Sequence, residues 1–518
     1  MKNGSFKLLL INPANQAKLG YLHDKATCMM PLGLGIVAAL TPSYWEVELL
    51  DEGFEEVVFR PADLVALTGF TASAARAYEI AAIYRKNGIH TVMGGIHASM
   101  CPEEAMNYMD SVVTGEAEGV WREVIADFER GEMKKLYEGG IGDIHKIPHV
   151  RRDIFKYPYI YDLVQTSRGC PWGCDFCSVT RMCGKTYRER DVEDVLDELE
   201  LTTRPLLFFI DDNLINNRKG AGERAIRLFR GMVERGIRKY WISQAALNFG
   251  DDDEVLYWAR KSGCVMILMG IEAEKETALE GISKKLNLKR GISSYETMLK
   301  KIHRYGIGIT GSLLFGLESD RNEDLYERGR YILRSSFDAY QCTILTPLPG
   351  TVLYDRLKEQ GRIILTNYPD DWQHYHFTVG AVNTPNMKAA EINGTMHGIW
   401  PHLYSKMNMR RKMFRTLWNT RSFVTAYWAY GTNHTYGRIA CEGKLHCNDP
   451  AHWVYASPWK NVLQWLYLKI TDKVLWVIYK LFWSRIIREQ FGYSDGYGTW
   501  KEKKQEPVRT VIDSSSLP

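Results

Sequence analysis

Short apolar runs alternate with amphipathic segments in two blocks of the chain, and the first block covers residues 6–135. Strands that are buried on both faces give continuous apolar runs, and helices between such runs connect parallel strands. The first block therefore predicts a doubly wound parallel sheet, in which ligands bind at the carboxyl ends of the strands. The expected strands are FKLLLIN, WEVELLD, DLVALTGF, HTVMGG and SVVTGE, and the expected helices are LGLGIVAAL and ARAYEIAAIYRKNG.

The second block contains six further strand-like runs, separated by amphipathic stretches such as 192–201, 221–235 and 295–305. Six strand–helix units are too few for an eight-fold barrel, so the pattern predicts a partial (β/α)6 barrel that is open at one side. The fold class is thus α/β. The expected strands are DLVQTS, PLLFFIDD, KYWISQAA, CVMILMGIE, GIGITGSLLFG and AYQCTILTP.

These patterns predict four parts of the chain. The doubly wound sheet occupies residues 1–140, a linker follows at 141–160, and the partial barrel occupies 161–365. The alternation stops near residue 364, and residues 366–518 form a mainly helical, aromatic and basic C-terminal region.

Composition and cysteine usage favour a folded protein of a reducing compartment. Hydrophobic residues at 45% and charged residues at 25% exclude a disordered or collagen-like chain. The first residues, MKNGSFKLLLINPA, lack the long apolar region and cleavage site of a signal peptide, so we expect a cytoplasmic protein. The ten cysteines are scattered apart from one central group, which favours metal ligation over disulfides.

That central group is TSRGCPWGCDFCSV, in which Cys170, Cys174 and Cys177 follow the first strand of the expected barrel. Parallel barrels place their chemistry at this end of the strands. Four thiolates close a zinc site or occupy every iron of a cubane, so three leave one metal corner open. A [4Fe–4S] cluster with an open iron can chelate a small molecule and pass it one electron.

The spacing resembles the motif of the radical S-adenosylmethionine superfamily, and Phe176 occupies the aromatic position before the third cysteine. The resemblance implies that the three cysteines hold the cluster and are the catalytic and metal-binding residues. It covers about residues 160–365. The alternative is a zinc knuckle with Cys183 as fourth ligand, which would leave the six strand–helix units unexplained.

Three more residues of the barrel are implicated by the same resemblance. Asp212, in FFIDDN, matches the acidic motif that lies near the methionine amino group, although a carboxylate at a strand end can also cap the next helix. Glu272, in MGIE, faces the site in this branch. Gly311, in GITGSLLFG, falls where the cofactor S-adenosylmethionine approaches the backbone closely, although a glycine in a strand can simply mark a bulge.

The first block resembles the cobalamin-binding domain that precedes the barrel in many radical enzymes. Its segments MPLGLGIVAAL, LTGFTASAARAYEIA, GGIHASMCPEEA and DSVVTGEAEGVW follow that domain's order. The Asp-x-His-x-x-Gly motif that supplies an axial histidine in other cobalamin proteins is absent, so no lower histidine ligand is expected. A nucleotide is the rival ligand, and the lack of Gly-x-Gly-x-x-Gly after the first strand disfavours it.

Small and glycine-rich turns after the third, fourth and fifth strands are the candidate cobalamin-binding residues, because they let a corrin ring lie close to the backbone. His97 also lies in one of these turns, where hydrogen bonding to its own loop or to cofactor amides is the favoured role over metal ligation. The other candidates are Thr71, Ser73, Gly94, Gly95, Gly115 and Glu116.

Net positive charge is confined to the C-terminal region. From Pro401 onward the chain has 18 Lys and Arg against 8 Asp and Glu, a formal charge of +10, whereas residues 1–400 carry −6. Tryptophans 459, 465, 476 and 483 accompany this charge, which favours binding at an anionic membrane surface. An apolar stripe at helical spacing runs through this region, and a core helix remains the alternative. The stripe is Leu463, Leu466, Ile470, Val474, Val477 and Leu481.

The resemblance implies an enzyme with a [4Fe–4S] cluster, S-adenosylmethionine and cobalamin, and the layout is most similar to hopanoid C-methylases. We expect C-methylation of a small hydrophobic substrate: a membrane lipid, an isoprenoid or a tetrapyrrole. Alternatives are a radical cyclase or oxidase, and a non-catalytic cobalamin or iron–sulfur sensor. The implied partners are a reductant such as flavodoxin or ferredoxin and the cytoplasmic face of a membrane. No nucleic-acid module is recognisable, so no nucleic acid is expected.

Overall fold

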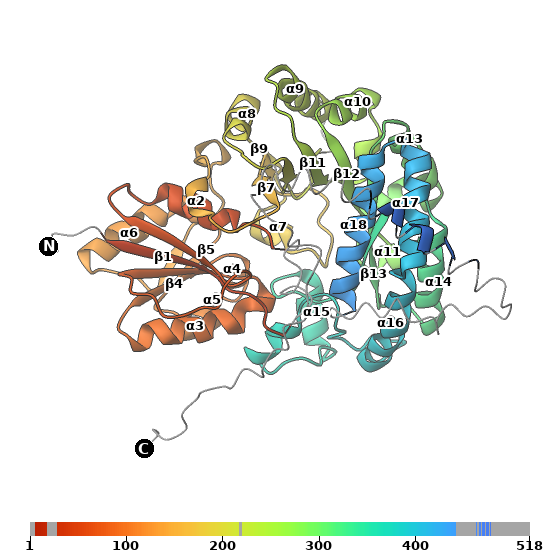
Figure 1. Ribbon diagram of the computed structural model, residues 1–518. Helices are drawn as coiled ribbons and strands as arrows, with labels where there is room; N and C mark the ends of the chain where they lie inside the picture. Colours follow the sequence, from red (N-terminus) through yellow and green to blue (C-terminus); the bar gives the residue numbers. More distant parts are fainter. Residues whose placement is uncertain are drawn as a thin grey trace. The chain divides into compact units, whose positions relative to one another are not determined.

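The first parallel sheet is built from the apolar runs of the first block (Figure 1). Its strands lie in the order β2-β1-β3-β4-β5-β6, and every neighbouring pair is parallel. This order has its switch point between β1 and β3, the place where doubly wound sheets bind ligands. The strands are β1 (Lys7–Asn12), β2 (Glu46–Asp51), β3 (Leu64–Thr68), β4 (His90–Gly94), β5 (Ser111–Thr114) and β6 (Leu136–Glu138).

Helices cover both faces of this sheet, as the sequence predicts. The core on one face includes residues of α2 and α6, and the core on the other face includes residues of α3 and α5. The two cores draw on alternate residues of β1, because successive side chains of a strand point to opposite faces. The helices are α2 (Leu32–Leu40), α3 (Ala74–Lys86), α4 (Ile96–Met100), α5 (Pro102–Tyr108) and α6 (Trp121–Arg130).

The second sheet is the predicted partial barrel. Its order is β14-β13-β12-β11-β10-β7, with all neighbours parallel and no pairing between the two end strands. The barrel is therefore open between β7 and β14. The strands are β7 (Tyr161–Val164), β10 (Leu206–Phe209), β11 (Tyr240–Gln244), β12 (Cys264–Glu272), β13 (Gly308–Phe315) and β14 (Ala339–Ile344).

Most of the helices that follow these strands bury their apolar faces in one large core with the sheet. A two-stranded antiparallel hairpin, β8 (Ser167–Arg168) with β9 (Arg188–Glu189), follows β7. The helices are α7 (Val179–Met182), α8 (Val192–Glu200), α9 (Ala221–Glu234), α10 (Asp253–Lys261), α11 (Glu276–Glu280), α12 (Lys285–Arg290), α13 (Tyr295–Arg304), α14 (Asn322–Arg334) and α15 (Val352–Glu359).

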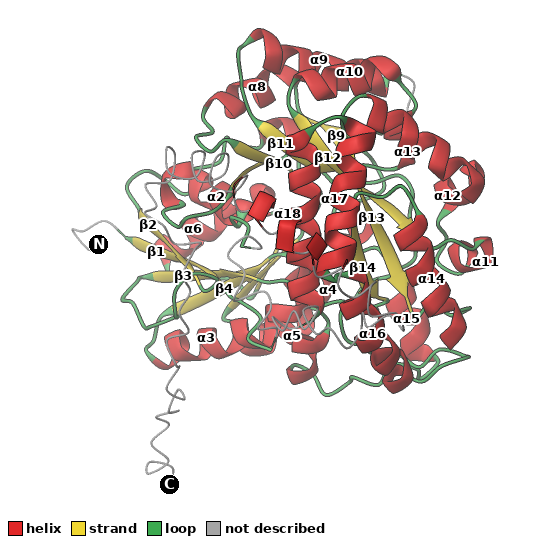
Figure 2. Cartoon of the chain, turned by 45° about the vertical axis from the view of Figure 1, so that its right-hand side comes forward, coloured by secondary structure: helices red, strands yellow, loops and turns green. Residues whose placement is uncertain are grey.

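Three longer helices follow the barrel: α16 (Ala389–Leu403), α17 (Lys406–Thr420) and α18 (Phe423–Ala440). Figure 2 shows α17 and α18 side by side in front of the second sheet. Buried Lys412 fixes α17 to the barrel, since its Nζ donates to the carbonyl oxygens of Ile332, Ser335 and Phe337. The helical character expected after the barrel is confirmed for these residues.

Two features of the first domain differ from the sequence prediction. The strand β6 was not predicted, because its three residues are too few to form a recognisable apolar run. The expected linker at 141–160 has only the single turns Ile144–Lys146 and Arg152–Ile154, yet its Val150 and Phe155 are buried against Gly35 of α2. This segment is therefore packed into the domain core.

The computed structural model describes residues 6–17, 28–216 and 220–441, with scattered helical residues between 463 and 477. The chain divides into one compact unit up to Val454 and a second unit, Tyr455–Pro518. Leu481 and the tryptophans of the second unit lie outside the described residues. Within the described part, no helix combines the length and the hydropathy that a membrane span requires.

Candidate active site

The three cysteines lie in one loop that begins at β8 and ends at β9. Gly169 enters this loop with a φ of +89°, and a Cβ there would lie 2.4 Å from the Thr186 carbonyl oxygen, so only glycine fits. The amide of Cys177 donates to the carbonyl of Cys174 at 3.1 Å, which forms a tight turn between the second and third thiols. The loop therefore gathers all three thiols at the carboxyl end of the first barrel strand.

The chemistry of these side chains fits an iron–sulfur cluster. All three thiols are half-buried, and burial raises the pKa of Cys170 and Cys174 and raises that of Cys177 to about 12. Metal ligation therefore has to displace protons. Among the described residues, no three His, Cys, Asp or Glu side chains are arranged to hold one metal ion. A cubane distributes its protein ligands over different iron atoms.

Two adjacent aspartates after β10 meet the start of the cysteine loop. Asp211 is completely buried and accepts hydrogen bonds from the amides of Thr166 and Ser167 and from the Thr166 hydroxyl. Asp212 accepts from the amide of Gly169 at 3.1 Å, and burial raises its pKa to about 6. Neither carboxylate caps the next helix, because the N-cap residue of α9 is Gly220 and no side chain caps this helix.

Glu272 is buried at the end of β12, with a φ of +64° that turns the chain sharply. It accepts a hydrogen bond of 2.6 Å from Lys284, whose Nζ lies 5.8 Å from the centroid of the Phe176 ring. Burial opposes the charge of Lys284, but Glu272 and Cys174 raise its pKa above the usual value. Lys284 thus joins three predicted site residues, and nothing in the sequence marks it for this position.

Gly311 lies on β13, and a Cβ there would meet the ring of Phe337 at 3.1 Å. Phe337 belongs to the core between the barrel sheet and its helices. Packing on this face is therefore sufficient to require a small residue. The role of Gly311 in the approach of S-adenosylmethionine stays a prediction.

The candidate cobalamin residues lie at the carboxyl ends of β3, β4 and β5, in turns that hydrogen bonds tie together. The Ser99 hydroxyl donates to the carbonyl of Gly95 and accepts from the amide of Gly115. The amide of His97 donates to the carbonyl of Gly69. Ser99 was missed in the sequence, where a serine in a short helix gives no signal. Thr71 and Ser73 form a buried turn beside this set.

Close contacts within the protein explain two of the glycines. Gly95 has a φ of +95°, and its Cβ would lie 2.8 Å from Thr68 Oγ1. A Cβ on Gly115 would lie 2.5 Å from the Gly140 carbonyl oxygen. Gly94 differs, because a Cβ there would make only ordinary contacts with Val113 at 3.9 Å. The turns lie at the carboxyl edge of the sheet, where cobalamin is expected. The contribution of each glycine to cobalamin binding stays a prediction.

His97 is completely buried, and the partners of its ring belong to α3 and α5 rather than to its own loop. Its Nε2 lies 3.1 Å from the Tyr78 hydroxyl and 3.2 Å from Glu104 Oε1. Glu104 also accepts from the indole nitrogen of Trp372, at 3.0 Å, so this carboxylate joins the first domain to a segment beyond the barrel. These contacts favour a structural role for His97 over metal ligation.

Glu116 makes ion pairs across the domain boundary. Its carboxylate is paired with Arg188 and lies 3.2 Å from Arg168, and both arginines flank the cysteine loop. Burial would raise the pKa of Glu116, but the hydrogen bond from Arg188 and the charges of the two arginines hold it below the usual value. The cobalamin role predicted for Glu116 remains a prediction, and these arginines were missed in the sequence.

Two family models match parts of this chain. The family model of the B12 binding domain matches residues 20–125, and that of the radical SAM superfamily matches residues 164–329. The fold resembles two solved structures. One is the cobalamin-dependent S-adenosylmethionine radical enzyme OxsB, with a TM-score of 0.59 at 15% identity over 82% of this chain and 72% of that chain. The other is the methyltransferase TsrM of Kitasatospora setae, with a TM-score of 0.60 at 16% identity over 76% and 89%.

Curated relatives are more similar in sequence. The chain is 30% identical to bacteriochlorophyllide d C-12(1)-methyltransferase of Chlorobaculum tepidum, over 71% of this chain and 81% of that protein. It is 26% identical to the C-8(2)-methyltransferase of the same organism, over 83% and 97%. Hopanoid C-2 methylase of Rhodopseudomonas palustris is 28% identical over 66% and 67%. The chain therefore belongs to the cobalamin-dependent radical S-adenosylmethionine methyltransferase family of enzymes, whose cofactors are cobalamin, S-adenosylmethionine and a [4Fe–4S] cluster.

Proposed function

We propose that this enzyme transfers a methyl group from S-adenosylmethionine to an unactivated carbon of a tetrapyrrole. The observation that carries the substrate class is the alignment with two bacteriochlorophyllide methyltransferases, which the chain covers to 81% and 97% of their lengths. The hopanoid methylase is matched over a smaller share of its length. A planar, hydrophobic substrate suits a barrel that is open at one side.

The chain's own residues divide the work of this reaction. Cys170, Cys174 and Cys177 would hold the [4Fe–4S] cluster through their three thiolates. Asp212, which binds the amide of Gly169, would accept a hydrogen bond from the methionine amino group. The Lys284–Glu272 pair, at the carboxyl end of β12, borders the cysteine loop at Phe176. When bound, these cofactors supply one-electron cleavage and methyl donation. The protein contributes orientation and exclusion of water.

Ring formation is the second candidate. The chain is 25% identical to the anaerobic magnesium-protoporphyrin IX monomethyl ester cyclase of Cereibacter sphaeroides, over 70% of this chain and 63% of that protein. Both reactions begin with hydrogen abstraction from a carbon that has no acidic proton. They differ in the product, because a methyl transfer adds mass and a cyclisation removes hydrogen.

One experiment separates these candidates. A host is grown anaerobically with and without the chain, with methionine labelled in its methyl group, and its pigment and lipid extracts are compared by mass spectrometry. We expect a new tetrapyrrole that carries one labelled methyl group. A labelled hopanoid would transfer the proposal to lipids. An unlabelled product that has lost hydrogens would establish the cyclase, and the absence of 5′-deoxyadenosine from the purified reduced enzyme would indicate a sensor.

We also infer peripheral membrane association through the second unit. Five residues of the predicted apolar stripe occupy helical positions spaced by three and four, and all are exposed. Leu463 is 63% and Ile470 is 61% exposed, which disfavours a core helix. Lysines 469 and 473 lie at exposed positions in the same segment. An apolar face with basic neighbours suits an anionic bilayer surface. The other exposed stripe residues are Leu466, Val474 and Val477.

Replacing Ile470 and Val474 with glutamate should reduce co-sedimentation with vesicles that contain anionic lipid by about tenfold, because two charges would face the acyl boundary. Removal of residues 455–518 should have the same effect. Threonine in place of exposed Val352, on α15 of the first unit, is the control and should leave sedimentation unchanged. Full sedimentation of the truncated chain would refute the association.

A further inference from the structure

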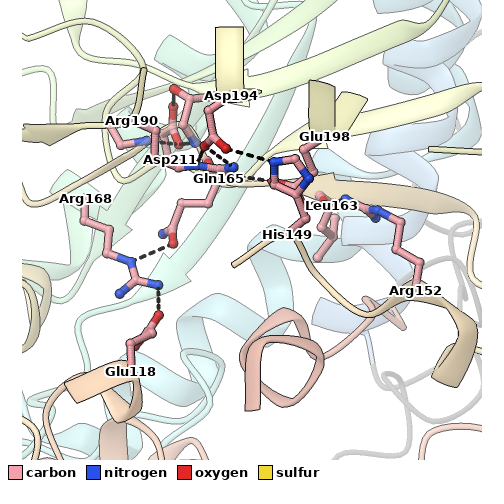
Figure 3. Close-up of polar contacts among 12 residues, drawn as sticks. Glu118, His149, Arg152, Leu163, Gln165, Arg168, Arg190, Asp194, Glu198 and Asp211 are labelled. Carbon is pink, nitrogen blue, oxygen red and sulfur yellow. Dashed lines mark hydrogen bonds and ion pairs between the residues drawn. The ribbon is translucent and has the colours of Figure 1, made fainter. Parts of the chain in front are cut away.

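The cysteine loop is attached at its base to the cobalamin-binding domain through Arg168. This residue lies on β8, two positions before Cys170, and is only 7% exposed. Its guanidinium donates to Glu118 at 2.6 Å (Figure 3). It also lies 3.2 Å from Glu116, in the same turn after β5. The same turn contains the candidate cobalamin residue Gly115.

The other strand of the hairpin is attached to the same carboxylate. Arg188 on β9 is the direct cross-strand partner of Arg168, and it pairs with Glu116. It also donates to the carbonyl of Gly142 at 2.7 Å and to that of Cys183 at 3.2 Å. Two adjacent guanidinium groups repel each other in the absence of a counter-charge. Glu116 and Glu118 supply two negative charges for these two positive ones.

The barrel side of this attachment is fixed by its own contacts. Asp211 binds Thr166 and Ser167, and Arg190 donates to the carbonyl of Gln165 at 2.9 Å. The side chain of Gln165 in turn accepts from Arg168 at 2.8 Å, and Figure 3 shows this run of contacts from Glu118 to Arg190. A displacement of the turn after β5 would therefore be transmitted to the base of the cysteine loop.

Other contacts hold the two domains together. The apolar core on one face of the first sheet also contains residues of α11 and α15 and the ring of Trp372. The indole of Trp372 in addition donates to Glu104. Loss of the arginine contacts should therefore loosen the hairpin locally and leave the domains associated. Methyl transfer requires two cofactor sites on different domains to keep a fixed relation, and misplacement by about 1 Å can cost about 10²-fold in rate.

We propose that Arg168 and Arg188, held by Glu116 and Glu118, are positioning residues that set the cysteine loop against the cobalamin site and so couple cleavage of S-adenosylmethionine to methyl transfer. The coupling of cleavage to methyl transfer rests on the proposed function. The positioning of the cysteine loop concerns the chain alone and is tested by a measurement that needs no substrate.

The test compares Arg168→Met with the wild-type full-length enzyme, reconstituted with cluster and cobalamin. Hydrogen exchange of segments 114–120 and 164–170 should accelerate at least tenfold. The iron content and the cluster's electron paramagnetic resonance signal should be retained, and 5′-deoxyadenosine formation should fall less than threefold. The methylated product per 5′-deoxyadenosine should fall at least tenfold. Arg168→Lys, which keeps the charge without the planar fork, should recover part of this ratio.

Arg181→Met is the matched control, since this arginine of α7 is exposed, lies between the same two strands β8 and β9, and should leave both readouts unchanged. A charge exchange, Arg168→Glu with Glu118→Arg, should restore slow exchange in both segments. Unchanged exchange in Arg168→Met would overturn the positioning role for any substrate. Accelerated exchange with an unchanged product ratio would overturn the coupling. A wild-type enzyme that makes no methylated product would refute the proposed function and leave the exchange result standing.

Discussion

A chain with alanine in place of Cys174 is expected to lose cleavage of S-adenosylmethionine by more than about 10³-fold, as when a group essential to the chemistry is removed. With only two thiols left in the loop, the cluster loses one of its three protein ligands. Iron and sulfide analysis of the anaerobically reconstituted protein, together with the yield of 5′-deoxyadenosine, measures this loss. Cobalamin binding, followed by absorbance, should persist because the first domain carries that site separately.

Cys183→Ala is the control for this prediction. Cys183 belongs to the same loop, is also half-buried, and burial raises its pKa to about 12 as for Cys177. A cluster with three cysteine ligands should keep its iron in this variant. Loss of metal from both variants would identify Cys183 as a fourth ligand and favour a zinc knuckle. Loss of cobalamin together with the cluster in Cys174→Ala would show that the two sites are interdependent.

The elements of both sheets could be predicted because their signals are local. Residues 8–11 form a continuous apolar run and are completely buried in β1, and CVMILMGIE becomes β12 with the same bounds. The three cysteines could be located for the same reason, since their spacing lies within one loop. A pattern that depends on consecutive residues can be recognised without knowledge of the fold.

The contacts that complete the site depend on pairs that are distant in sequence. Arg188 and Glu116 are 72 positions apart, and Arg168 and Glu118 are 50 positions apart. Neither arginine differs in its local sequence from a surface arginine. Lys284 likewise becomes recognisable only when β12 and the following helices bring it to Glu272. Gly95 and Gly115 show the opposite difficulty. Contacts with neighbouring residues already require glycine at both positions, so these glycines do not by themselves indicate a cofactor site.

Replacing Arg328 with leucine should lower the free energy of unfolding by about 3–5 kcal/mol, because it leaves buried carboxylates without a counter-charge. Arg328 of α14 has no exposed surface, and its guanidinium binds Asp320 through two nitrogens at 2.6 and 2.8 Å. It also binds Glu274 at 2.7 Å and the carbonyl of Leu314 at 2.8 Å. Glu274 and Asp320 follow β12 and β13, so the loss also loosens the edge of the barrel that bears the site.

The decrease in Tm should be about 3–5 °C and is measured on the cofactor-free protein. Arg330→Leu is the matched control, an exposed arginine on the same helix whose replacement should change the free energy by less than about 0.5 kcal/mol. Combining Arg328→Leu with Asp320→Asn should cost less than the sum of the single changes, because the second substitution removes one of the unpaired charges. Strict additivity would mean that Arg328 stabilises α14 through packing of its stem, and the ion pairs would then contribute little to the barrel edge.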